Sequence, residues 1–227
     1  RFWKYDNPHK ITQTTDLSFF TGIESFNDNS VAVAIPNFAV LETRLESKNT
    51  RRAIGSVDSE AGTEWAITLT AFGYKSHRLR LDGGIHAEWG RFWTAGLPHN
   101  VLHLKFAAGY RHTDENFGIS NFFLGGFGNR YLEDRHVKQY RQATHFPGVP
   151  VFSLASPRFA KVMLENNLPP LRVAGIKSGQ HHLSHIDASW FAQGVLTDWS
   201  KNGRRINFGG QINFVFEHWF NLESTLS

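Results

Sequence analysis

The sequence predicts an all-β fold, an antiparallel up-and-down transmembrane β-barrel. The first reason is alternation over residues 100–113, where one parity is apolar at Leu102, Leu104, Phe106, Ala108 and Tyr110. The second is length: this run covers about ten residues, and a strand that crosses a bilayer needs about 9–11, whereas soluble strands usually have about 5–6. The third is recurrence, because several other segments repeat the same dyad pattern, which is typical of a barrel with an oily outside and a wet lumen.

Composition agrees with this fold class without requiring it. No apolar run reaches about 18 residues, so no transmembrane helix is predicted. Aromatic residues make up 14% of the chain, which suits the aromatic girdles of a membrane barrel and equally an aromatic-rich soluble β-sandwich. Cysteine is absent, which excludes disulfide scaffolds and cysteine-based zinc sites. The net charge of +4 is spread along the chain, so nucleic-acid binding is not predicted.

Four alternating runs predict strands in the N-terminal half. Their leading apolar positions are Leu17 and Phe19 within Ile11–Glu24, Leu41 and Leu45 within Ala39–Glu46, Ile67 and Leu69 within Glu64–Tyr74, and Leu81 and Ile85 within Arg78–Trp93. The polar, glycine-containing segment Ser47–Thr63 predicts a long exposed loop or a hairpin extension between the second and third runs. Gly83 and Gly84 interrupt the fourth run and predict a bend or bulge.

The C-terminal half begins with residues 100–113 and then loses its alternation. From Asn116 to Gly148, scattered glycines and a charged stretch predict a long irregular insertion, and loops of this length in compact folds are usually functional or disordered. Alternation returns in three further runs, Lys161–Asn167, His185–Thr197 and Arg205–Phe220. The order of the runs predicts a meander of roughly nine to eleven strands in one domain, residues 1–227.

Closure and the chain ends raise the question of completeness. A sheet in lipid must close, because an open edge leaves backbone groups unpaired, so an odd or too small strand number would place part of the barrel outside this chain. The chain starts at Arg1 without an initiator methionine or a signal peptide and ends in strand-like residues. We therefore expect a mature fragment or the ordered part of something larger.

The insertion contains the most specific stretch of the chain, FFLGGFGNRY at residues 122–131. It resembles the "LGG … (V)RG(F/Y)" signature of the bacterial surface antigen family, the barrel domains of outer-membrane protein assembly factors and their secretion relatives. Residues 161–169 are similar to the family's "ExRxP" strand, residues 190–194 to its "[FW]xDxG" strand and residues 208–226 to its last strands. The four motifs occur in the family's order.

The resemblance implies a role for the loop arginine. In the family, this arginine folds into the barrel and pairs with acidic groups on the lumen wall, where a charge must be paired or solvated. The implied lumen-loop motif consists of Gly125, Gly126, Arg130 and Tyr131. By parity, Glu165 and Asp187 are the predicted lumen partners of Arg130. The alternative is that Arg130 is a solvent-exposed loop arginine.

The chain departs from the family pattern at three motif positions. Tyr131 stands where the family usually has glycine, Asn167 replaces the arginine of "ExRxP", and Ala192 replaces the aspartate of "[FW]xDxG". The last change removes the usual acidic partner of the loop arginine, which is why the two alternative acids are considered.

Other polar groups have simpler explanations than catalysis or metal binding. Zinc needs three or four convergent ligands, and in the closest histidine cluster (His181, His182 and His185) the middle residue points away from the other two on a strand. Asp82, His86 and Glu88 share one face of a run, but lumen-facing polar residues need no catalytic role. No nucleophile, phosphate-binding or zinc-protease motif occurs. We therefore predict no enzyme activity, no metal and no cofactor.

The predicted function follows from the resemblance: a non-enzymatic outer-membrane barrel involved in inserting or translocating proteins at the bacterial outer membrane. Its partners would be outer-membrane lipid and substrate proteins or other outer-membrane and periplasmic components. One alternative is a barrel that serves as a membrane anchor or passive pore for a fused or associated soluble module. The second is a soluble β-sandwich or lipocalin-like binding protein, which predicts shorter strands and an inward apolar face.

Overall fold

The structure is a computed structural model that describes residues 3–4, 9–21, 37–75, 79–112, 121–126, 137–151, 153–173, 177–178, 181–197, 199, 203–218 and 222–226. Its strands are β1 (Trp3–Lys4), β2 (Lys10–Phe20), β3 (Phe38–Ala53), β4 (Ala61–Lys75), β5 (Leu79–Thr94), β6 (Val101–His112), β7 (Phe122–Leu124), β8 (Leu154–Ser156), β9 (Arg158–Asn167), β10 (Leu171–Arg172), β11 (Lys177–Ser178), β12 (His181–Thr197), β13 (Arg204–His218) and β14 (Leu222–Leu226). One 3-10 turn, η2, covers Gln139–Arg141. No helix within these ranges is long and apolar enough to span a membrane.

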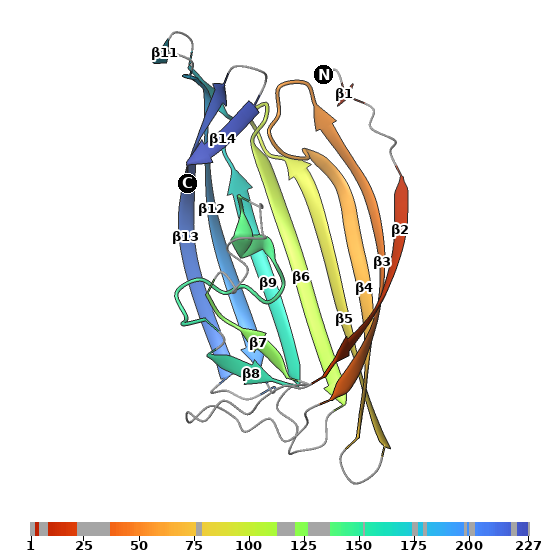
Figure 1. Cartoon of the computed structure of the whole chain (residues 1–227). Coiled ribbons are helices and arrows are strands. Elements are labelled where there is room, and N and C mark those ends of the chain that lie inside the picture. The colour runs from red at the N-terminus through yellow and green to blue at the C-terminus, as the bar shows by residue number, and fades with distance from the viewer. Residues whose placement is uncertain are drawn as a thin grey trace.

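One large antiparallel sheet contains all the long strands. Its main path runs β1-β3-β4-β5-β6-β9-β12-β13-β14, with β2 also paired to β3, and β10 and β11 paired to β12. β7 and β8 form a separate two-stranded sheet. The predicted all-β, antiparallel, up-and-down arrangement is therefore confirmed. Figure 1 shows a curved sheet with β2 at one edge and β13 and β14 at the other.

The two faces of the sheet differ sharply in polarity. We call the face that carries the segment between β6 and β9 the inner face and the opposite one the outer face. Large apolar side chains stand exposed on the outer face, at Leu17, Phe19, Leu41, Leu45, Ile67, Leu69, Leu81, Ile85, Phe106, Tyr110, Val162, Leu164, Trp190, Ile206, Phe208 and Ile212. Buried polar side chains lie on the inner face, at Thr68, Thr70, Asp82, His103, Lys161, Glu165, Asn167, Asp187, Ser189, Gln193 and Asn213. The hydrophobic pattern is thus the inverse of a soluble sheet with an apolar core.

The described residues of the segment between β6 and β9 (121–126, 137–151 and 153–157) lie along the inner face (Figure 1). The segment is longer than the predicted Asn116–Gly148, because β6 ends at His112 and β9 begins at Arg158. Within the described residues, no pairing joins β2 to β13 or β14, so the predicted closure of the barrel is not found.

The structure decides two predictions for the N-terminal half. The segment Ser47–Thr63 is a hairpin extension and not a long loop, because β3 continues to Ala53 and β4 starts at Ala61, which leaves a turn at residues 54–60. Its polar side chains are those of paired strands. Gly83 and Gly84 do not mark a bulge, since both pair in register with β4. A Cβ atom at Gly84 would lie 2.5 Å from Cγ of Arg111, so this glycine makes room for a neighbouring side chain.

Candidate functional site

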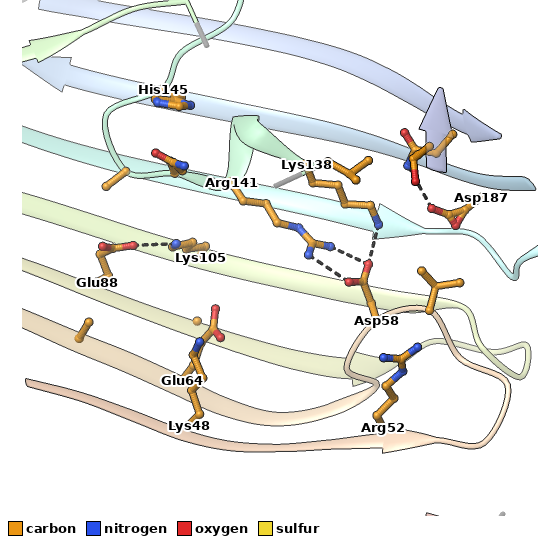
Figure 2. Close-up of a pocket in the computed structure, with 18 of the residues that line it drawn as sticks. Lys48, Arg52, Asp58, Glu64, Glu88, Lys105, Lys138, Arg141, His145 and Asp187 are labelled. Carbon is orange, nitrogen blue, oxygen red and sulfur yellow. Dashed lines mark hydrogen bonds and ion pairs between the residues drawn. The ribbon is translucent and has the colours of Figure 1, made fainter. Parts of the chain in front are cut away.

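A compact turn at residues 138–146, the inserted turn, lies against the inner face of β9 (Figure 2). Three of its amides donate hydrogen bonds to carbonyls of the same turn at 3.1–3.3 Å (Arg141 to Lys138, Gln142 to Gln139 and His145 to Gln142). The His145 ring Nδ1 also lies 2.9 Å from the Gln139 carbonyl oxygen. These internal bonds help to fix the shape in which the turn presents its side chains to β9.

Arg141 forms the centre of the contact with the wall. Its Nε donates to Oε2 of Glu165 at 2.7 Å and its Nη2 donates to Oε1 of the same carboxylate at 2.8 Å. Glu165 is fully buried on β9, between β6 and β12. Two parallel charge-assisted hydrogen bonds give this pair both strength and a fixed orientation. A buried carboxylate is tolerated here because it is paired and hydrogen-bonded.

Asp58 joins the same network from the turn between β3 and β4. Arg141 Nη2 donates to Asp58 Oδ2 at 2.9 Å, and Lys138 Nζ donates to the same oxygen at 2.5 Å (Figure 2). Lys138 Nζ also donates to Oδ1 of Asn167 at 2.5 Å. Burial alone would raise the pKa of Asp58, but the nearby cations Arg141 and Lys138 outweigh it and hold the pKa at about 2. Two cations and two carboxylates therefore balance in one cluster, which we call the ionic latch (Asp58, Lys138, Arg141 and Glu165).

Tyr140 adds an aromatic contact beside the ionic latch. Its ring stacks on that of Phe191 with centroids 4.1 Å apart, and its side chain is almost fully buried. The hydroxyl donates to Oε1 of Glu165 at 2.9 Å and lies 2.9 Å from the hydroxyl of Ser189. Burial and the charge of Glu165 raise the pKa of Tyr140 well above its ordinary value, so the hydroxyl stays a donor.

Lys161 also binds the inserted turn, but here a side chain of the sheet contacts the backbone of the turn. It lies four residues before Glu165 on the same face of β9 and is buried. Its Nζ donates to the carbonyl oxygens of Tyr140 at 3.2 Å, Gln142 at 2.7 Å and His145 at 2.5 Å. One ammonium group thus uses all three of its donors on a single turn.

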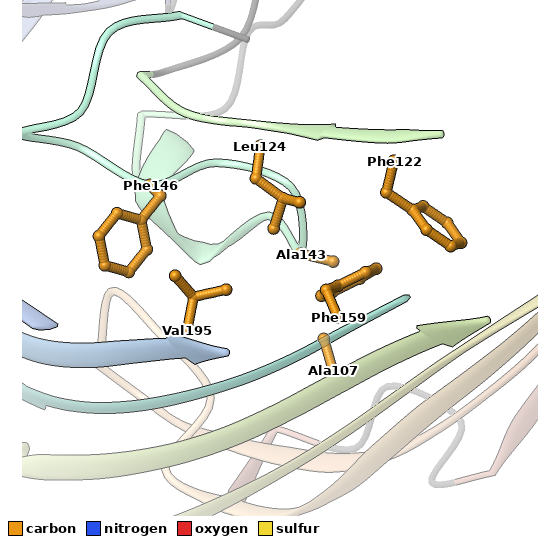
Figure 3. Close-up of a cluster of buried hydrophobic side chains, with 7 residues drawn as sticks. All are labelled: Ala107, Phe122, Leu124, Ala143, Phe146, Phe159 and Val195. Atoms are coloured by element: carbon orange, nitrogen blue, oxygen red, sulfur yellow. The ribbon is translucent and has the colours of Figure 1, made fainter. Parts of the chain in front are cut away.

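An apolar cluster holds β7 and the C-terminal part of the inserted turn against the large sheet (Figure 3). Phe122, Leu124, Ala143 and Phe146 of the segment pack on wall residues Ala107, Phe159 and Val195, and all seven are buried. Phe122 and Phe159 meet edge to face with centroids 4.9 Å apart. We call these seven residues the apolar cluster.

The predicted glycines lie beside the apolar cluster. Gly125 and Gly126 both have positive φ angles, of 138° and 54°, which favour glycine. The amide of Gly126 donates to the Val149 carbonyl at 2.8 Å, and its own carbonyl accepts from Phe146 at 2.9 Å. The two glycines therefore turn the chain so that the segment pairs with itself over the wall.

The predicted acidic partners differ in their surroundings. Glu165 binds Arg141, whereas Oδ2 of Asp187 accepts a hydrogen bond from Nδ2 of Asn213 at 3.0 Å. Arg130 and Tyr131 lie outside the described residues, so the pairing of Arg130 stays a prediction. Sequence reasoning missed Arg141. The available signal was a Tyr-Arg pair at the end of the charged stretch of the insertion.

A polar cavity of about 1250 Å³ runs beside the inserted turn. Its lining includes alternate residues of β3 with opposite charges (Glu42, Arg44, Glu46 and Lys48) and the latch residues Asp58, Lys138 and Arg141. On the neighbouring strands, Lys105 Nζ lies 2.7 Å from Oε2 of Glu88 (Figure 2). The inner face is therefore a polar surface with paired charges, and it leaves a cavity next to the inserted turn.

Three of the candidate catalytic and metal groups, Asp82, Glu88 and His182, have structural partners. Asp82 accepts a hydrogen bond from the Tyr74 hydroxyl at 3.1 Å, and Glu88 pairs with Lys105. His182 Nε2 lies 3.0 Å from Oε2 of Glu217. Within the part of the chain that the structure describes, no three histidine or acidic side chains come together as a metal site.

Comparison with known proteins gives no relative. No protein-family model matches the chain, and no curated protein and no solved structure matches it either. The resemblance to the surface antigen family therefore rests on the sequence motifs and stays a prediction.

Proposed function

We propose that this chain forms the wall of a bacterial outer-membrane β-barrel that takes part in inserting or translocating proteins, with the segment between β6 and β9 as an internal plug. The observation that carries the proposal is the inverted polarity of the sheet. Leu81, Ile206 and Phe208 are 76%, 81% and 85% exposed, while ionised side chains are buried on the other face. Lipid against the outer face would make this arrangement favourable.

Strand length supports the same proposal. β3, β4, β5, β12 and β13 have 15–17 residues each, and β6 has 12. A tilted strand of about 9–11 residues already crosses the hydrocarbon layer. A soluble sandwich or lipocalin-like protein would turn its apolar face inward, so the described faces argue against that alternative.

The ionic latch favours a barrel with the inserted turn bound inside it over an open, passive pore. Buried charges tie the inserted turn to the inner face of the sheet, beside a polar cavity. Together with the family resemblance, this favours a barrel that handles polypeptides and needs no nucleotide. The second candidate is a membrane anchor, which a permanently latched lumen would also serve.

Gel mobility and depletion test the proposal in two steps. The full-length protein is taken from a washed outer-membrane fraction and run unboiled and boiled. The proposal expects it in that fraction with a heat-dependent change in mobility, and a soluble protein with unchanged mobility would contradict it. Depleting the protein should then lower the amounts of other outer-membrane proteins. A loss confined to a fused or associated module would instead favour the anchor.

A further inference from the structure

The inner face of β9 and β12 forms a receptor for the inserted turn with two kinds of recognition. Glu165, Ser189 and Phe191 contact the side chains of Tyr140 and Arg141. This part of the receptor reads side chains, because only a planar guanidinium makes the two parallel bonds to one carboxylate.

Lys161 contacts the backbone of the inserted turn and not its side chains. Its three hydrogen bonds end on carbonyl oxygens, so they do not depend on which side chains follow the Tyr-Arg pair. The Lys161 contacts are therefore independent of side-chain identity, whereas Ala143 and Phe146 of the turn also pack in the apolar cluster. Such a combination of side-chain anchors and main-chain hydrogen bonds is how sites recognise short peptide segments.

The inserted turn behaves as a bound ligand of this receptor. Three backbone hydrogen bonds within the turn and one from its His145 ring support its shape. The polar cavity reaches Lys138, Arg141 and Gln142, so one side of the turn borders open space. A competing segment therefore has a route to the receptor.

We propose that the inner face of β9 and β12 is a peptide-binding site for an aromatic-arginine turn, occupied at rest by Tyr140–Arg141 and exchangeable with a polypeptide segment of the same chemistry. The source of that segment, a polypeptide handled by the barrel, rests on the proposed function. The site itself rests on the contacts of the described residues. Lys161 acts in it as a positioning residue, because it orients the peptide backbone.

The test removes the side chains of Tyr140 and Arg141 from the site, which gives the emptied protein, and then supplies them again on a free peptide. The double variant Tyr140→Ala/Arg141→Ala is purified in detergent and titrated with a fluorescent peptide that spans residues 137–146 (VKQYRQATHF), with binding read by anisotropy. We expect the emptied protein to bind at least about tenfold tighter than the unmodified protein, in which the turn competes. A peptide with lysine in place of its arginine should bind at least about tenfold more weakly, because it loses the bidentate contact.

Adding Lys161→Met to the emptied variant isolates the backbone contact. We expect the affinity for both peptides to fall by a similar factor of about ten. Equal binding by the emptied and unmodified proteins, or an unchanged affinity after Lys161→Met, would overturn the proposal. The unboiled gel mobility of each variant checks that it is folded. This mobility also keeps the two proposals separate, since absent peptide binding leaves a heat-modifiable barrel intact.

A second measurement does not depend on the double variant. The chain has no cysteine, so Gln142→Cys places one thiol on the turn beside the cavity. Unlabelled peptide should raise the rate of maleimide labelling if the turn exchanges with it. A rate that the peptide does not change would contradict exchange.

Discussion

The inserted segment is attached to the wall in two places that work by different physics. At the apolar cluster, Leu124 and Phe146 pack on Phe159 and Val195 without any charge. At the ionic latch, Arg141 and Lys138 meet Glu165 and Asp58 at 2.5–2.9 Å. The first contact is non-directional and little affected by salt or pH. The second is directional and fails if one partner is lost, because the remaining charge is then buried and unpaired.

This contrast indicates which of the two attachments, the apolar cluster or the ionic latch, is released more readily. Apolar packing degrades gradually as atoms are removed, whereas a buried ion cluster is either complete or strongly unfavourable. We therefore expect the apolar cluster to be the permanent anchor and the ionic latch to be the releasable end. The following predictions test this contrast.

The largest effect is expected at Glu165. Glu165→Ala leaves Arg141 with one carboxylate partner and should destabilise the folded protein by about 3–5 kcal/mol. The measurement is the urea midpoint of the change in unboiled gel mobility. Glu46→Ala is the control, because Glu46 is partly exposed and its ion pair with Arg44 is long, at 3.4 Å. Similar losses of stability in Glu165→Ala and Glu46→Ala would contradict a special role of the ionic latch.

Leu124→Ala tests the apolar cluster. Leu124 is fully buried, and truncating a buried leucine typically costs about 2–5 kcal/mol through lost burial and a cavity. Phe123→Ala is the matched control on the same strand, since Phe123 points to the other side and is 39% exposed. The loss at Leu124 should stay the same as the pH is lowered. A loss that vanishes in acid would mean that the two attachments are not independent.

Acid should weaken the ionic latch through Asp58. The pKa of Asp58 is lowered from 3.8 to about 2 in the folded protein. Its contribution is therefore complete above about pH 4 and is lost as the pH falls toward 2, an effect of about 2 kcal/mol. Asp58→Asn should remove this part of the pH dependence of the urea midpoint. If the variant and the unmodified protein lose stability in parallel between these pH values, Asp58 is not the group responsible.

The smallest effect is expected at the tyrosine hydroxyl. Tyr140→Phe keeps the stacking on Phe191 but removes the hydrogen bond to Glu165, which should cost about 1 kcal/mol. Tyr110→Phe on the outer face serves as the control, with an expected change within about 0.5 kcal/mol. A Tyr140→Phe loss as large as that of Glu165→Ala would show that the hydroxyl, and not the ion cluster, dominates.

Much of the wall was predictable because alternation is a local signal. The apolar parity of residues 100–113 identified the outer face of β6, and Val162 and Leu164 did the same for β9. Polarity left residues 47–53 undecided between a loop and a hairpin extension, because a strand with many polar side chains resembles a loop in composition. The ionic latch was hidden for a different reason. Asp58 and Arg141 are 83 residues apart, and only the folding back of the segment brings them together.

The most direct test of the account asks which face of the sheet meets lipid. Single cysteines are placed on β3 at outer positions Leu41 and Leu45 and at inner positions Glu42 and Glu46, in a chain without native cysteine. Each is spin-labelled in reconstituted membranes and probed with oxygen, which concentrates in lipid, and with a water-soluble nickel chelate. We expect oxygen to relax the spin labels at positions Leu41 and Leu45, and the nickel chelate to relax those at positions Glu42 and Glu46. Chelate access at the outer positions would contradict the account.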